Sequence, residues 1–210
     1  MTGVDAFDRN KKQKAVLLDR DGTINKEIGD LYKYSDWEFV EGSDSAIKLI
    51  KKLGYLVVVI TNQSGVAREY YTEADVDDLH QNVNNLLWRT RGVVIDAFYI
   101  CPHHPDYTGD CECRKPKPGM LLQAACELNI DLTKSYMIGD KWTDVQSGLS
   151  CGCKTALVKS GHGIDESKLD LSLIEVYENL YDFTKTLLCN QSKLETMQGG
   201  SLIRFAEELN

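Results

Sequence analysis

The sequence predicts an α/β fold with a doubly wound parallel sheet, and three observations support this prediction. Short apolar runs without polar alternation, the first at residues 15–18, are typical of strands that are buried on both faces. Segments with helical apolar periodicity separate these runs, so successive strands are expected to pair in parallel through right-handed crossovers. Several of the runs end in polar residues, as expected where an open sheet binds a ligand at its carboxyl edge.

The expected elements alternate along the chain. Strands are expected at residues 15–18, 55–60, 93–100, 135–138, 154–158 and 171–176. Helices are expected at residues 43–53, 72–91 and 118–128, with a short helix ending at 149 and a further helix ending at 188. Ser43 and Thr72 are the expected N-caps of the first two helices, with Asp75 completing an imperfect capping box at the second. His80 is expected to be an exposed residue of that second helix.

The length of 210 residues suits one domain. We expect a polar arm at residues 1–13, a single domain at residues 14–188, and a tail of unknown role at residues 189–210 with a short helix from Leu202. Residues 24–41 are too short for a separate domain and are expected to form a flap over the end of the first strand. The fold would therefore carry only a minimal cap.

Composition limits the partners of the protein. The net charge of −8 disfavours nucleic acid as a ligand, because nucleic-acid binders are usually basic. No run of about 18 apolar residues is present, so no membrane span is expected. The polar N-terminal stretch lacks the apolar centre of a signal peptide, which predicts a cytoplasmic protein, and we expect a monomer. Seven cysteines, an odd number, then indicate reduced thiols and a metal site rather than disulfides.

Polar side chains follow three of the predicted strands. Asp19 and Asp21 come directly after the first strand, and residues two apart in an extended segment point the same way. Thr61 follows the second strand, and Asp140 and Asp144 follow the fourth. If the first strand lies between the second and the fourth, these side chains meet at the switch point of the sheet. Taken singly, Asp140 and Asp144 could be ordinary acidic residues at a helix start.

The segments around these residues resemble the motifs of the haloacid dehalogenase superfamily of phosphatases. In the order of that family they are LLDRDGTIN, ITNQSGVAR, CPHHP, CECRKPKPGM and IGDKWTDV. The narrower resemblance is to the heptose bisphosphate phosphatases and their histidinol-phosphate phosphatase relatives, and it covers about residues 14–160. The fold that this resemblance implies agrees with the one predicted from the apolar pattern.

The resemblance implies a chemical role for each acid. Asp19 would be the nucleophile that forms an aspartyl-phosphate, and Asp21 the general acid that protonates the leaving alkoxide and then activates water. Mg²⁺ would be the cofactor, held by the Asp19 side chain, the Asp21 backbone carbonyl and Asp140. Asp144 would support the site without binding the metal directly.

The resemblance also implies which residues contact the substrate. Thr61 and Lys115 would hold the transferring phosphoryl oxygens, and Arg114 would recognise the rest of the substrate. For Glu27 and Asp30 in the flap, a solvated loop is the alternative interpretation. The full implied set is Glu27, Ile28, Gly29, Asp30, Thr61, Asn62, Gln63, Ser64, Arg114, Lys115 and Lys141.

A second group of candidate metal ligands lies in residues 101–113. Three thiolates and one imidazole are the ligand set of a closed structural zinc site. The Cys-x-His and Cys-x-Cys spacings are tighter than in an ordinary zinc finger, so it is the resemblance that implies Zn²⁺ here, with His104 as the rival ligand to His103. The implied ligands are Cys101, His103, Cys111 and Cys113. Cys151 and Cys153 are a metal or redox pair or simply a helix-to-strand turn.

The function expected from these residues is hydrolysis of a small sugar phosphate with Mg²⁺. The substrate implied by the resemblance is the 7-phosphate of a heptose 1,7-bisphosphate, on the route to activated heptose for surface polysaccharide. The alternative enzyme is a histidinol-phosphate phosphatase, since the same motifs serve both. A phospho-accepting signalling receiver is disfavoured, because its acceptor aspartate would follow the third strand, which here ends in Ile100-Cys101. A non-catalytic interaction protein is disfavoured by the intact pair of Asp19 and Asp21.

Overall fold

The computed structural model describes residues 12–161 and 174–197. Its strands are β1 (Ala15–Leu18), β2 (Leu56–Asn62), β3 (Ala97–Cys101), β4 (Tyr136–Gly139), β5 (Lys154–Val158) and β6 (Glu175–Tyr177). Its α-helices are α1 (Ser43–Lys52), α2 (Ser64–Ala67), α3 (Glu73–Arg91), α4 (Pro105–Thr108), α5 (Gly119–Glu127), α6 (Trp142–Ser150) and α7 (Leu180–Met197). Two 3₁₀ turns, η1 (Tyr34–Asp36) and η2 (Leu132–Lys134), complete the described elements.

The strands form one parallel sheet of six strands in the order β3-β2-β1-β4-β5-β6. Strand β1 lies between β2 and β4, where Leu18 is level with Val59 on one side and Ile138 on the other. The predicted fold class and the predicted place of the first strand are therefore confirmed. The chain leaves β1 and β4 at the same edge, which brings the acids that follow the two strands together.

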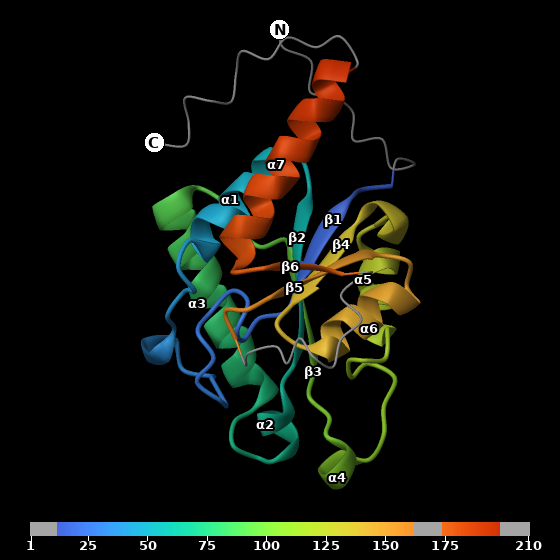
Figure 1. Ribbon diagram of the computed structural model, residues 1–210. Coiled ribbons are helices and arrows are strands. Elements are labelled where there is room, and N and C mark those ends of the chain that lie inside the picture. The colour runs from blue at the N-terminus through green and yellow to red at the C-terminus, as the bar shows by residue number, and fades with distance from the viewer. Residues whose placement is uncertain (1–11, 162–173, 198–210) are drawn as a thin grey trace, which may run out of the picture.

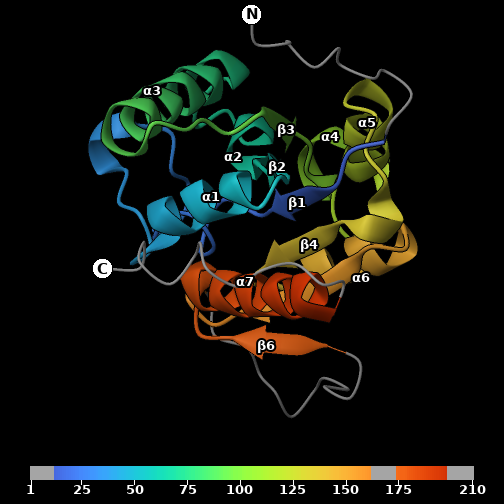
Figure 2. The same ribbon diagram turned by 90° about the horizontal axis from the view of Figure 1, so that it is seen from above.

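Helices cover both faces of the sheet, and Figure 2 shows α1 and α3 on one side with α5 and α6 on the other. One apolar core joins Val16 and Leu18 to buried residues of α1, α3 and α7, such as Phe183. The second core joins Ala15 and Leu17 to residues of α5. All four residues of β1 are fully buried, as the unbroken apolar run predicts for a central parallel strand.

The segment between β1 and α1 is a flap without a domain of its own. Its only described element is η1, and it lies with α2 and α4 around the carboxyl edge of the sheet (Figure 1). Thr23, Ile24 and Asn25 in its first part are fully buried. The minimal cap predicted from the sequence is thus a short loop that reaches over the strand ends.

The structure confirms one of the two predicted helix caps and contradicts the other. The predicted capping box at Thr72 is present, because its Oγ1 accepts from the Asp75 N–H at 3.2 Å and the Asp75 carboxylate accepts from the Thr72 N–H at 2.8 Å. The prediction for Ser43 is wrong, since Gly42 is the N-cap, with φ of 76°. The Ser43 hydroxyl donates instead to the carbonyl of Ile24 at 2.6 Å, which ties the flap to α1.

The expected boundaries need three corrections. Strand β3 begins at Ala97 and not at residue 93, because Asn84 of α3 bonds both the N–H and the carbonyl of Ile95 and holds that stretch outside the sheet. Helix α7 continues to Met197 instead of ending at 188, since no glycine or proline interrupts the chain before residues 199–200. Gln13, expected in the arm, exchanges backbone hydrogen bonds with residues 129 and 131. Residues 1–11 of the arm and the helix expected from Leu202 lie outside the described residues.

Within the described residues, no helix combines the length and apolar character needed to cross a bilayer.

Candidate active site

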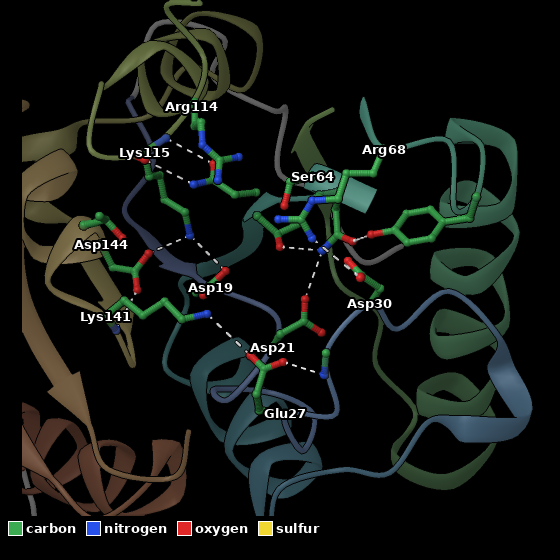
Figure 3. A pocket seen from close by; sticks show the side chains of 16 residues that line it. Asp19, Asp21, Glu27, Asp30, Ser64, Arg68, Arg114, Lys115, Lys141 and Asp144 are labelled. Carbon is green, nitrogen blue, oxygen red and sulfur yellow. Dashed lines mark hydrogen bonds and ion pairs between the residues drawn. The ribbon is translucent and has the colours of Figure 1, made fainter. Parts of the chain in front are cut away.

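A pocket of about 510 Å³ opens at the carboxyl edge of the sheet (Figure 3). The turn after β1 supplies Asp19 and Asp21, and the turn after β4 supplies Asp140 beside Asp19. Most of the expected substrate-contacting residues line this pocket, while Ile28, which is 56% exposed, does not. The lining residues are Asp19, Asp21, Glu27, Gly29, Asp30, Thr61, Asn62, Gln63, Ser64, Arg68, Tyr71, Arg114, Lys115, Lys141, Thr143 and Asp144.

Lys115 is the buried cation at the centre of the site. Its Nζ lies 2.9 Å from Asp19 Oδ1 and 2.6 Å from Asp144 Oδ1, and it donates to the Ile60 carbonyl at 2.7 Å. Burial alone would lower the pKa of Lys115, but the carboxylates of Asp144 and Asp19 raise it above its ordinary value. The ammonium therefore stays charged and fixes the ends of β1, β2 and the loop before α5 in one arrangement.

Three buried acids surround this ammonium. Oxygen atoms of Asp19, Asp140 and Asp144 all lie within 4.8 Å of one another. Burial raises the pKa of Asp144 to about 7, with further contributions from Asp19 and Asp140 and an opposing one from Lys115. For Asp19, burial would raise the pKa, but the Lys115 ammonium, the Lys141 charge and the Arg20 N–H together lower it. Asp19 is therefore the carboxylate that is kept ionised, as a nucleophile must be.

Two glycines allow these acids to approach one another so closely. Gly22 has φ of +81°, and a Cβ there would lie 2.6 Å from an Asp140 oxygen. A Cβ at Gly139 would lie 2.1 Å from an Asp144 oxygen. A side chain at either position would displace a carboxylate, so both motifs need glycine for steric reasons, and Gly22 is needed for its backbone conformation as well.

Asp21 is held by three donors at the back of the pocket. The fully buried Arg20 guanidinium donates to both carboxylate oxygens at 3.0 Å, Asn25 donates at 2.9 Å and Gln63 at 3.0 Å. The Gln63 carbonyl in turn accepts from the Tyr71 hydroxyl at 2.8 Å. This network orients the Asp21 carboxylate, and its members come from the turn after β1, the flap and the segment between β2 and α3.

His80 belongs to the support of this network and not to the surface. Its side chain is buried, stacks on Phe98 with ring centroids 4.1 Å apart, and lies 3.4 Å from an Arg20 nitrogen. Burial, together with the Arg20 charge, lowers the pKa of His80 to about 3. The expectation of an exposed residue is wrong because the helical period of α3 directs this position toward the sheet.

The loop after β2 connects the site to the segment before α5. Thr61 Oγ1 accepts from the Gln63 side-chain amide at 3.0 Å. Asn62 bonds both the N–H and the carbonyl of Lys115 at 3.1 Å, and Ser64 begins the short helix α2 at the pocket wall. The TNQS sequence thus positions Lys115 and Asp21 in addition to facing the pocket itself.

The flap contributes two acids that pair with cations of the opposite wall. Glu27 lies 3.4 Å from Lys141 Nζ and also accepts from the Gly29 N–H at 2.9 Å. Asp30 lies 3.7 Å from Arg68. Both acids line the pocket; the Glu27 side chain is mostly buried, whereas the Asp30 side chain is 38% exposed and remains open to solvent.

The sequence analysis missed Arg68, Tyr71 and Thr143 as pocket residues. The sequence held a signal for Arg68, because this residue ends the ITNQSGVAR segment and follows the polar loop after β2. Thr143 had the same kind of signal, because it lies within the IGDKWTDV segment. Tyr71 lies outside the quoted segments, and only the folded structure brings it to the pocket wall.

The cysteine–histidine loop forms a tight cluster next to the pocket. Cys113 Sγ lies 3.2 Å from Cys101 Sγ, 3.4 Å from Cys111 Sγ and 3.3 Å from His103 Nδ1. Cys101 Sγ lies 3.7 Å from Cys111 Sγ and 3.8 Å from His103 Nδ1. A tetrahedral metal with bonds of about 2.3 Å places its ligands about 3.8 Å apart, so the donor set fits a four-coordinate metal.

His104 stands apart from this cluster. Its Nδ1 accepts from the Asp106 N–H at 3.3 Å and caps α4. The cluster instead connects to the active site through Arg114, whose Nη1 donates to the His103 carbonyl at 2.9 Å. Because Arg114 directly precedes Lys115, the position of the loop bears on the position of the buried ammonium.

The chemistry of the acid cluster fits a hard divalent cation. Asp19, Asp140 and Asp144 offer carboxylate oxygens, the ligands that Mg²⁺ prefers. The ammonium groups of Lys115 and Lys141 offset only part of their charge, because Lys141 also pairs with Glu27. A buried excess of negative charge is stabilised when a cation binds. The residues present are therefore suited to hold Mg²⁺.

The chain is similar to curated enzymes of one kind. It is 47% identical over 161 residues, 73% of this chain and 86% of the relative, to a D-glycero-beta-D-manno-heptose-1,7-bisphosphate 7-phosphatase of Pasteurella multocida. It is 42% identical over 160 residues, 73% of this chain and 83% of the relative, to the enzyme of that name from Escherichia coli.

The chain is also similar to solved structures of heptose bisphosphate phosphatases. A D,D-heptose 1,7-bisphosphate phosphatase from B. bronchiseptica, complexed with magnesium and phosphate, superimposes with a TM-score of 0.78 at 34% identity, covering 85% of this chain and 99% of the other. The heptose bisphosphate phosphatase of Burkholderia thailandensis gives a TM-score of 0.60 at 27% identity, covering 84% and 99%. A sequence model of the HAD-hydrolase-like family matches residues 112–182. The chain thus belongs to the haloacid dehalogenase-like hydrolases, in the family of the heptose bisphosphate phosphatases.

Proposed function

We propose that this protein hydrolyses the 7-phosphate of D-glycero-β-D-manno-heptose 1,7-bisphosphate with Mg²⁺. The observation that carries this proposal is the 47% identity to a curated 7-phosphatase, of which the chain covers 86%. The buried acid cluster and the ion pair between Lys115 and Asp19 also support this proposal on chemical grounds. The relatives act on the β-anomer by name, which favours that anomer here.

The reaction follows from the positions of Asp19 and Asp21. The ionised Asp19 carboxylate attacks phosphorus, the bond to the sugar oxygen breaks, and Asp21 gives its proton to that oxygen. Asp21 then removes a proton from water, whose oxygen attacks the aspartyl-phosphate and releases phosphate from Asp19. Arg20, Asn25 and Gln63 orient Asp21 for both proton transfers.

Cations and polar groups of the pocket reduce the charge repulsion of this reaction. Lys115 and Thr61 hold the oxygens of the transferring group, while Arg114 and Lys141 contact the remainder of the substrate. Asp19, the Asp21 carbonyl and Asp140 would hold Mg²⁺, with Asp144 supporting them through Lys115. Bound there, the ion would neutralise charge between the nucleophile and the phosphoryl group.

We further propose a structural Zn²⁺ at the cysteine–histidine cluster. A closed set of three thiolates and one imidazole leaves no coordination position for a substrate. The metal would hold the loop that carries Arg114 and Lys115, through the bond from Arg114 to the His103 carbonyl. We also propose that the protein is a cytoplasmic monomer, and gel filtration tests the oligomeric state.

The test of the function is phosphate release with Mg²⁺ on a substrate panel. The panel holds both anomers of heptose 1,7-bisphosphate, histidinol phosphate and common hexose phosphates. We expect kcat/KM for the β-anomer to exceed that for the hexose phosphates about a hundredfold, some 2.7 kcal/mol of transition-state discrimination. A preference for histidinol phosphate would reject the proposed substrate in favour of the alternative while leaving the chemistry unchanged.

A further inference from the structure

Four cationic side chains line the pocket, and three of them have well-defined roles. Lys115 bonds Asp19 and Asp144, Arg114 bonds the His103 carbonyl, and Lys141 pairs with the flap. The fourth, Arg68, has no role in the mechanism described above. Within residues 12–161 and 174–197, its recorded side-chain contact is the pair with Asp30 at 3.7 Å.

Arg68 stands at the wall away from the buried ammonium. It is the C-cap of α2, where its backbone N–H donates to the Ser64 carbonyl at 3.2 Å, and its side chain is 30% exposed. Figure 3 shows Arg68 and Asp30 on one side of Asp21, with Lys141 and Asp144 on the other. A ligand whose reacting group lies at Asp19 can therefore extend across the pocket toward Arg68.

We propose that Arg68 binds the second phosphate group of the substrate, the one that is not hydrolysed. This inference rests on the proposed function, which makes the substrate a bisphosphate. Guanidinium and phosphate match in geometry and form paired, charge-assisted hydrogen bonds of about 2.8 Å. At 3.7 Å the contact to Asp30 is longer than such a bond, so the guanidinium keeps donors available for an anion that enters the pocket.

The alternative role for Arg68 is that of a latch that fixes the flap through Asp30. The two roles differ in what the substrate's second phosphate contributes. A latch acts equally on every substrate, because it shapes the pocket before any substrate binds. A phosphate-binding residue acts only on substrates that carry the second phosphate, and removal of Asp30 would not weaken it.

The experiment compares Arg68→Gln, Asp30→Asn and the unchanged chain on two substrates. These are heptose 1,7-bisphosphate and heptose 7-phosphate, which differ only in the second phosphate. For Arg68→Gln we expect kcat/KM to fall about 10- to 100-fold on the bisphosphate, mainly through KM, and less than about threefold on the 7-phosphate. Asp30→Asn should retain the preference for the bisphosphate. Arg91→Gln, which removes a similar surface pair with Asp44 away from the pocket, should change neither value.

Equal losses on both substrates for Arg68→Gln would overturn the proposal in favour of the latch, and no loss on either would overturn both roles. Failure of the proposed function is seen separately, as the absence of turnover of both heptose phosphates by the unchanged chain. The same variants are then compared on a hexose 1,6-bisphosphate and a hexose 6-phosphate. The unchanged chain should have a higher kcat/KM on the hexose 1,6-bisphosphate than on the hexose 6-phosphate, and Arg68→Gln should remove this preference. If either expectation fails, the assignment of Arg68 is wrong.

Discussion

Replacement of Lys115 by methionine tests how the active site is held together. Methionine has a similar length but no charge, so Lys115→Met leaves Asp19 and Asp144 buried without the ammonium between them. It also leaves the Ile60 carbonyl without its side-chain donor. The protein should therefore lose stability as well as activity.

The size of the stability loss follows from the burial of the pair. Breaking a buried ion pair from one side costs about 3–5 kcal/mol, because the partner charge remains in an apolar environment. In a chain of this length, each kcal/mol lowers Tm by roughly 2–4 °C, so the expected loss is roughly 6–20 °C. The pKa of Asp144 is already raised to about 7 by burial, and it should rise further without Lys115. Proton uptake by Asp144 then limits the loss, which should be smaller at pH 6 than at pH 8.

The assay is thermal unfolding in the presence of a chelator and again with Mg²⁺. We expect Mg²⁺ to restore part of the lost Tm, because a cation at the acids replaces some of the missing positive charge. The double variant Lys115→Met/Asp144→Asn should be more stable than Lys115→Met alone, since it removes one uncompensated acid. Lys134→Met, which removes an exposed pair with Asp131, should shift Tm by no more than about 3 °C. If Lys115→Met unfolded within 2 °C of the unchanged chain in chelator, the buried charge cluster would not be a determinant of stability.

Three further predictions concern other parts of the site. Asp21→Asn should lower kcat by about 10²- to 10⁴-fold with the circular dichroism spectrum unchanged, and full turnover would reject Asp21 as the acid and base. Cys113→Ser should lose the loop metal, measured by elemental analysis, and lower Tm, whereas Cys126→Ser on exposed α5 should do neither; an active, freshly purified sample without zinc would refute the structural role. His80 is neutral in the fold, with its pKa lowered to about 3, but takes up a proton near pH 6.5 when unfolded. The unfolded state binds more protons between these values, so stability falls as the pH is lowered, by about 2 kcal/mol from pH 7 to pH 5. His80→Gln should flatten this dependence in urea titrations, and an unchanged slope would assign it to other groups.

The principal strands and the meeting of the acids at the edge of the sheet could be predicted from the sequence because their signals are local. An unbroken apolar run such as residues 15–18 is diagnostic of a central parallel strand, and the residues that follow it must lie at the carboxyl edge of the sheet. The place of the first strand between the second and the fourth was inferred from the polar residues that follow these three strands, and the sheet order confirms it. The family resemblance then assigned chemistry to these positions, and the similarity to the heptose bisphosphate phosphatases confirms that family.

Only the tertiary structure decided which side chains complete the site, because these contacts join residues far apart in the chain. His80 is buried because α3 packs against β3, and Ser43 bonds the flap instead of its own helix. Arg68 pairs with Asp30 because the flap lies opposite the end of α2. An isolated arginine, histidine or serine is compatible with either a core or a surface position. Its partner is set by how the loops close over the sheet, and no local pattern in the sequence records that closure.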